Sequence, residues 1–247
     1  MPPRLASKLM ALPLPADDRG SPWRGSLLLQ GADDGAEFDA TAELLSYFVR
    51  FAATGAFGAG SIAIDVRRRR GRLQAEVAAS GLHPGTWRVL VQMLAHCRQM
   101  EPYDDFALQA LDQASGWHAD RRLLLQPYPT LMAPPAGVEL ALDEDALTGD
   151  SLDLRLTSAR KLGSAEVKAF GERVKDWGSL AYTGGFTAVD QAIDEPLLDQ
   201  PSTSRAGPQA IDVVVSQLAA PAEAWCSLVN LGLAMASRLG LVRIEAA

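Results

Sequence analysis

The chain is poor in the residues and motifs that usually reveal a function. Its 247 residues include two cysteines and three histidines, too few for a disulfide framework or for a metal site recognisable by its spacing. It has no phosphate-binding glycine loop followed by Lys-Ser/Thr, no GxSxG turn, no HExxH and no CxxC pattern. The sequence therefore predicts no metal and no cofactor, and it favours a protein that is not an enzyme.

Excess positive charge and long apolar runs are also missing. The chain has 23 basic and 30 acidic residues, a net charge of −7, which argues against nucleic acid or an anionic membrane as a partner. The arginine-rich stretch 67–72 lies at a predicted hairpin tip with no aromatic residue interleaved, as in a solvated turn. No stretch approaches the ~20 apolar residues of a membrane span. Pro13 and Pro15 interrupt the apolar run of a signal peptide, so we expect a cytoplasmic protein.

What the sequence does contain is an order of strands and helices that occurs twice. The first copy is predicted from period-2 and period-3.6 apolar patterns and from turn residues, with Gly55 ending its first helix in a left-handed conformation. Its elements are a strand at 26–30, a helix from about residue 39, a hairpin of strands at 61–66 and 73–80, a helix after Pro84 and a strand at 106–111.

The second copy follows the same order after residue 150. Its elements are a strand at 152–158, a helix from Ser164, a second strand for which 187–193 is the best candidate, a strand at 210–218, a helix opened by Pro221 and a closing strand at 241–246. Trp87 and Trp225, in the second helix of each copy, are expected to be core anchors between helix and sheet.

The two copies also match in their residues. TGAFGA at 54–59 resembles TGGFTA at 183–188, and a shift of 129 residues relates them. The same shift keeps apolar character at four helical positions, pairing Phe38 with Val167, Leu45 with Val174, Phe48 with Trp177 and Phe51 with Leu180. The second helices need a shift of 138, so we expect a loop inserted at 195–209. Internal duplication explains these matches, and two unrelated α/β halves of alanine-rich composition are the alternative.

The order β-α-β-β-α-β resembles the ferredoxin-like arrangement. We therefore predict an α+β fold of two tandem ferredoxin-like (βαββαβ) repeats, with antiparallel sheets and helices on one face. The other sheet face would need cover, so we expect the repeats to pack as an intramolecular pseudo-dimer that hides apolar surface. The predicted organisation is an irregular N-terminal arm at 1–25, a first repeat at 26–111, a joining segment at 112–151 and a second repeat at 152–247.

The joining segment carries most of the net negative charge, since it has seven acidic and two basic residues, and it is rich in proline. A structureless link of this length is unusual in a compact protein, so strands are expected near 121–126 and 138–142, with the prolines confining them to edges.

Five residues form the candidate ligand-binding set. His118 lies beside Trp117 and Asp120, which places a titratable ring next to an aromatic ring and a carboxylate. His83 precedes a helix and could face a cleft, or could serve only to fix the start of that helix. Tyr128 is a further candidate for a pocket between the repeats. Thr54 and Thr183, by contrast, are expected to cap local carbonyls at helix ends.

Three kinds of function fit these observations. The first is a non-enzymatic binding or interaction protein of the inhibitor, immunity or adaptor type, whose acidic surface would attract a basic protein. The alternative is a small-molecule enzyme or ligand-binding protein with its pocket between the two repeats. A purely structural subunit is the third, and it would need exposed apolar surface.

Overall fold

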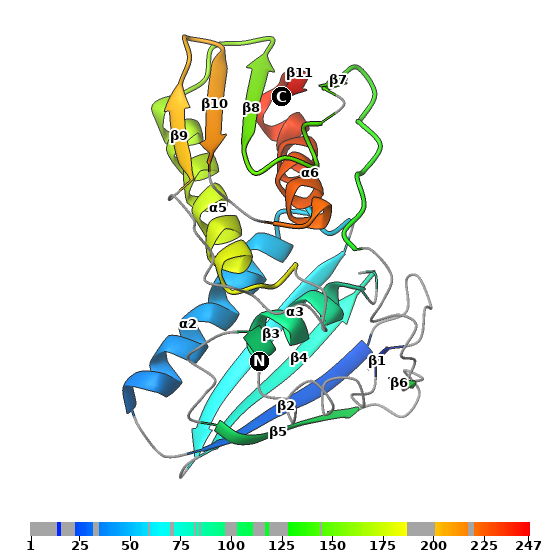
Figure 1. Ribbon diagram of the computed structural model, residues 1–247, viewed down its shortest axis with the longest axis vertical. Coiled ribbons are helices and arrows are strands. Elements are labelled where there is room, and N and C mark those ends of the chain that lie inside the picture. Colours follow the sequence, from blue (N-terminus) through cyan, green and yellow to red (C-terminus); the bar gives the residue numbers. More distant parts are fainter. Residues whose placement is uncertain are drawn as a thin grey trace.

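The computed structural model describes most of the chain. The described residues are 14–15, 23–31, 35–58, 60–69, 72–81, 83, 85–96, 103–110, 117–118, 128–143, 145–186, 201–216 and 220–247. They form an α+β structure with two main sheets, one in each half of the chain (Figure 1).

The first half has a four-stranded antiparallel sheet in the order β3-β4-β2-β5 and two helices. Its elements are β2 (Trp23–Gly31), α2 (Gly35–Ala52), β3 (Ser61–Arg69), β4 (Arg72–Ser80), α3 (Gly85–His96) and β5 (Tyr103–Ala110). These match the predicted order, although β2 begins inside the segment assigned to the N-terminal arm. Alternate residues of β4, such as Leu73 and Val77, are buried, as the period-2 pattern predicts.

The second half has a five-stranded sheet in the order β7-β11-β8-β10-β9. Its elements are β7 (Glu139–Leu142), β8 (Leu152–Ser158), α5 (Ser164–Tyr182), β9 (Ser202–Arg205), β10 (Ala210–Val215), α6 (Ala222–Leu239) and β11 (Leu241–Ala246). All neighbours are antiparallel except β7, which adds to β11 in parallel. β7 comes from the joining segment, where the sequence predicted a strand at 138–142. The strand expected at 121–126 lies outside the described residues.

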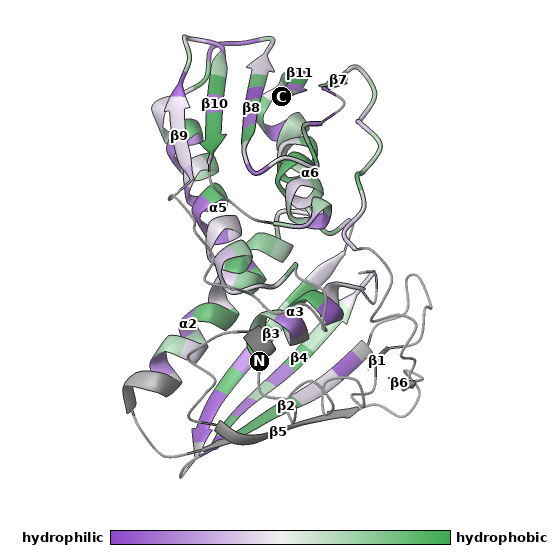
Figure 2. Ribbon diagram, viewed as in Figure 1, coloured by the Kyte–Doolittle hydropathy of each residue, from purple (hydrophilic) through white to green (hydrophobic). Residues whose placement is uncertain are grey.

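One strand of the second half is not where the sequence analysis placed it. The hairpin partner of β10 is β9, which lies inside the segment expected to be a loop at 195–209. The candidate at 187–193 lies outside the described residues. The apolar pattern of the sequence did not predict β9, because this strand consists of four polar residues at the edge of the sheet (Figure 2). An exposed edge strand does not need alternating apolar side chains.

Local turn chemistry follows the sequence closely. After α2, Thr54 Oγ1 donates to the Phe51 carbonyl at 2.6 Å and Gly55 takes a φ of 90°. After α5, Thr183 Oγ1 donates to the Ser179 carbonyl at 2.9 Å and Gly184 takes a φ of 77°. Both threonines therefore cap helix ends, as predicted, and the glycines supply the left-handed turn.

The two halves meet through their helices, whereas the sequence analysis expected them to pack so as to cover the bare faces of their sheets. α2 packs against α5 in the middle of the molecule, and each sheet lies on the far side of its own helices (Figure 1). The outer sheet faces carry polar pairs, such as Gln74 with Ser26 and Arg155 with Asp212. The Arg155–Asp212 pair on the second sheet is exposed to solvent, whereas Ser26 on the first sheet is buried.

Candidate functional site

A connected set of polar side chains lies where the joining segment crosses the start of α3. We call residues Tyr128–Met132 of that segment the strap. The His83 ring stacks on the Tyr128 ring, with centroids 4.8 Å apart and planes 14° apart. His83 Nδ1 accepts a hydrogen bond from the Gly85 N–H at 3.0 Å, so the histidine also fixes the turn that leads into α3. Two of the five candidate residues are thus in contact.

The structure places the backbone of two other candidates, Trp117 and His118, away from this contact. Trp117 and His118 form the short strand β6 (Trp117–His118), which pairs with β1 (Leu14–Pro15) from the N-terminal segment. Asp120 lies outside the described residues. The described backbone therefore ties Trp117 and His118 to the N-terminal segment.

Tyr128 is held by a directed chain of hydrogen bonds. Its hydroxyl donates to the Phe57 carbonyl at 2.9 Å, so Thr86 Oγ1, also 2.9 Å away, must be the donor to the tyrosine oxygen. Burial raises the pKa of Tyr128 to about 12. The phenol therefore stays protonated at neutral pH and serves to anchor the strap between the turn after α2 and the start of α3.

Gly85 makes this anchorage possible. A Cβ at this position would lie 2.7 Å from Tyr128 Cδ1, well inside van der Waals contact. We predict that Gly85→Ala displaces the ring and destabilises the protein by about 1–3 kcal/mol, the usual cost of overpacking. Urea denaturation measures the loss. In a Tyr128→Ala background the same change should cost almost nothing, and an equal cost in both backgrounds would show that the ring is not the obstacle.

Two buried polar side chains continue the site along α3. Arg88, 4% exposed, donates from Nη2 to the Tyr128 carbonyl at 3.0 Å, and burial lowers the pKa of its guanidinium. Gln92 follows one helical turn later, is fully buried, and has no hydrogen-bond partner for either its Nε2 or its Oε1. The face that carries them is turned away from the first sheet, because Gly85 and Val89 on it contact Tyr128 and Gly185.

The strap goes on to α6, where it meets the counterpart of Gln92. Asn230 is 1% exposed, accepts from the Met132 N–H at 2.8 Å and donates to the Thr130 carbonyl at 2.9 Å. One stretch of chain therefore binds the second helix of both halves. We call this region the seam: the strap, α3, α6 and the turns that follow α2 and α5.

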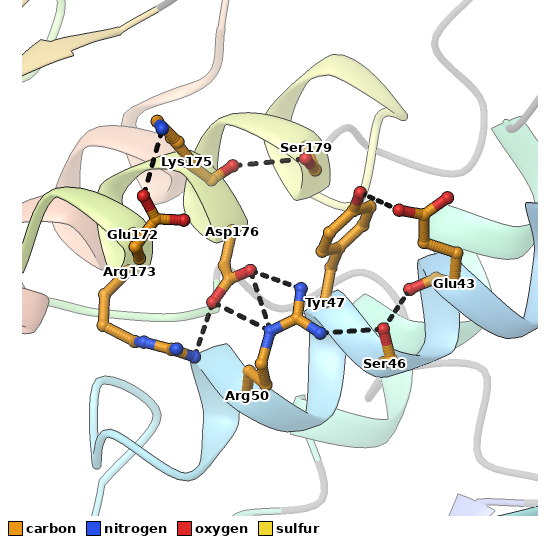
Figure 3. Close-up of polar contacts among 9 residues, drawn as sticks. All are labelled: Glu43, Ser46, Tyr47, Arg50, Glu172, Arg173, Lys175, Asp176 and Ser179. Carbon is orange, nitrogen blue, oxygen red and sulfur yellow. Dashed lines mark hydrogen bonds and ion pairs between the residues drawn. The ribbon is translucent and has the colours of Figure 1, made fainter. Parts of the chain in front are cut away.

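A charged cluster lies beside the seam, on α2 and α5 (Figure 3). The Asp176 side chain is 5% exposed and lies between two arginines. Arg50 donates to Asp176 Oδ1 at 2.8 Å from Nη2 and at 3.1 Å from Nε, and Arg173 Nη1 lies 2.6 Å from Oδ2. Arg50 also stacks over the Tyr47 ring at 4.8 Å. This cluster joins α2 to α5.

The described residues place limits on other chemistry. Among them, no three His, Cys, Asp or Glu side chains gather closely enough to hold a metal ion. No helix within the described ranges is long and apolar enough to cross a membrane.

Sequence reasoning missed Thr86, Arg88, Gln92 and Asp176, because each gains its importance from partners distant in the chain. One signal was available: Gln92 and Asn230 match each other in the aligned stretches from Trp87 and Trp225. A polar residue that recurs on an otherwise apolar helix face is a candidate for a buried polar contact.

Comparison with known proteins gives little more. No family model and no curated protein matches the chain. Among solved structures, the chain resembles one described as a candidate glycine cleavage system transcriptional repressor, with 10% identity, a TM-score of 0.23 and coverage of 92% of this chain and 96% of that one. It also resembles a product complex of Cas6, with 12% identity, a TM-score of 0.22 and coverage of 92% and 100%. Likenesses this weak carry no argument about the function of the chain.

Proposed function

We propose that the chain is an internal duplication, with two ferredoxin-like repeats packed as an intramolecular pseudo-dimer. The order β3-β4-β2-β5 of the first sheet recurs as β9-β10-β8-β11 in the second. The shift of 129 residues carries the start of α2 at Gly35 onto the start of α5 at Ser164. The shift of 138 carries the starts of β4 and β5 onto those of β10 and β11. By the strand register, eight of the nine added residues then lie between Phe186 and β9, and the ninth lies in the turn between β9 and β10.

The contacts between the halves support the same proposal, because they are reciprocal. The turn after α2 packs on α6, where a Cβ at Gly55 would lie 3.5 Å from Ala234. The turn after α5 packs on α3, where a Cβ at Gly185 would lie 3.4 Å from Met93 Cβ. Phe57 and Phe186, which match in sequence, contact each other with ring centroids 6.5 Å apart. Matching residues that meet across an interface are typical of two-fold symmetric packing.

For the function, we propose a non-enzymatic binding protein that holds a small polar ligand at the seam. The observation that carries this proposal is the carboxamide of Gln92, which is buried without a hydrogen-bond partner. Leaving such a group unsatisfied costs about 1–3 kcal/mol, and native proteins rarely retain one without a reason. Its counterpart Asn230 is fully paired by the strap. A bound molecule at Gln92 would play the part that the strap plays at Asn230.

Binding is favoured over catalysis because the two titratable rings at the seam already have structural tasks. The Tyr128 hydroxyl is committed to the Phe57 carbonyl, and its raised pKa makes it a poor acid or base at neutral pH. His83 Nδ1 accepts from the Gly85 N–H. A protein partner drawn to the acidic surface and an enzyme with its pocket at the seam remain the competing hypotheses, and detectable turnover of any seam ligand would favour the enzyme.

The first test compares two substitutions at matching positions. Gln92→Met removes the unpaired amide at similar volume, so we expect the ligand-free protein to gain about 1 kcal/mol of unfolding free energy. Asn230→Leu removes two hydrogen bonds, to the Thr130 carbonyl and from the Met132 N–H, so we expect a loss of about 1–3 kcal/mol. Chemical denaturation measures both.

Binding is then tested by thermal shift against a broad metabolite collection. We expect a stabilising ligand for the wild-type protein and none of that stabilisation for Gln92→Met. A loss of stability in Gln92→Met would mean that the amide is satisfied in solution. Together with ordered water alone at Gln92 in a crystal, that result would reject the binding proposal.

A further inference from the structure

We infer that the seam ligand carries a carboxylate with an N–H or O–H donor beside it, and that Gln92 and Arg88 recognise this pair of groups. This inference names the ligand class for the binding function proposed above and rests on that function. It follows from what the Gln92 amide lacks and from the charge that lies next to it.

The Gln92 amide determines which hydrogen-bonding groups the ligand must have. Gln92 Nε2 offers two N–H donors and Oε1 is an acceptor, and neither atom has a partner. A ligand with acceptors alone would satisfy Nε2 and leave Oε1 stranded. A ligand that satisfies both must present an acceptor and a donor within the span of one carboxamide, as a carboxylate with a neighbouring hydroxyl or ammonium group does.

The adjacent arginine determines which charge the acceptor group of the ligand should carry. Arg88 precedes Gln92 by four residues, so their side chains are neighbours on one face of α3. Both residues are at most 4% exposed, so the positive charge of Arg88 acts through protein with little screening by water. A neutral carbonyl would satisfy Gln92 Nε2 equally well, but the field of a buried guanidinium favours an anionic acceptor.

The surrounding charges further limit the net charge that the ligand can carry. Glu223, in the first turn of α6, is the acidic side chain whose charge acts on Arg88. Because its negative charge already offsets part of the Arg88 charge, a ligand with more than one negative charge, such as a dicarboxylate or a phosphate, is disfavoured. A small monocarboxylate with one donor fits this balance best.

The test uses matched compounds that differ by one group. Glycolate and glycine carry both the carboxylate and the donor, acetate keeps only the carboxylate, and glycolamide and glycinamide lack the charge. Larger 2-hydroxy and 2-amino acids with their amides extend the series. Isothermal titration calorimetry measures each compound against wild type, Gln92→Met, Arg88→Lys and Arg155→Gln. The last variant removes an exposed cation from the outer sheet face and controls for net charge.

We expect members of the acid series to bind at least tenfold more tightly than their amides and than acids without the donor. We expect Gln92→Met to weaken them at least tenfold. Arg88→Lys should weaken them less than Gln92→Met does, because lysine keeps the positive charge that favours the carboxylate, and Arg155→Gln should leave them unchanged. Amides that bind as well as acids would overturn the carboxylate assignment while leaving the binding function intact. The carboxylate assignment fails in the same way if the broad screen yields only ligands without a carboxylate. If no compound of either screen binds, both proposals fail.

Discussion

Replacing Phe57 with alanine is expected to reduce the unfolding free energy by about 3–5 kcal/mol, the range for a buried phenylalanine. The ring is 4% exposed and lies at the centre of an aromatic cluster. Its centroid is 5.2 Å from that of Phe51, 5.9 Å from Phe48, 6.2 Å from Tyr128 and 6.5 Å from Phe186. Because these neighbours come from α2, the strap and the second half, the cavity would loosen both the core and the seam.

Chemical denaturation followed by tryptophan fluorescence measures this loss, since Trp87 reports on the first half and Trp177 and Trp225 on the second. Phe57→Leu retains much of the buried volume and should cost far less. A double-mutant cycle with Phe186→Ala should give a coupling of about 0.5–1.5 kcal/mol, the value of an aromatic pair beyond area burial. Strict additivity would show that the two rings do not join the halves.

Replacing Asp176 with asparagine is expected to reduce the unfolding free energy by about 2–3 kcal/mol. Removing one member of a buried ion pair usually costs more, about 3–5 kcal/mol. The substitution keeps the shape and removes the charge that balances Arg50 and Arg173 (Figure 3). The expected loss is lower than usual because the two arginine side chains are 40% and 27% exposed and can turn partly to water.

Asp212→Asn is the matched control. Asp212 binds Arg155 in a similar two-bond geometry, 2.8 and 2.9 Å, but on the solvated outer face of the second sheet. Exposed ion pairs contribute little, so this variant should stay close to wild type in denaturation. If the two variants lost equal stability, the cluster between α2 and α5 would contribute no more than a surface ion pair, and the halves would be joined by apolar contacts and by the hydrogen bonds of the strap.

The repeat and most of its elements could be predicted because they depend on local patterns. Thr54 and Thr183 cap helix ends wherever the halves lie, since their partners are three or four residues away. β4 and β8 show their buried faces in alternation along the sequence. β9 could not be found this way, because an exposed edge strand carries no apolar alternation.

The site was only half predicted for the same reason. His83 and Tyr128 were chosen separately, and their contact came only with the fold. The cluster of Trp117, His118 and Asp120 stays a prediction, because the side chains of all three lie outside the described residues.

By itself, the sequence determined the order of elements, the turns that end α2 and α5, and the residues that must be buried, because periodicity and glycine conformations act over a few residues. The tertiary structure decided which helices meet, and it joined Arg50 to Asp176 across 126 positions. It also placed the strap in contact with α3 and α6, and it buried the Gln92 amide without a hydrogen-bond partner. These features arise only when two surfaces distant in the sequence pack together and exclude water. A local sequence pattern cannot predict which two surfaces will meet.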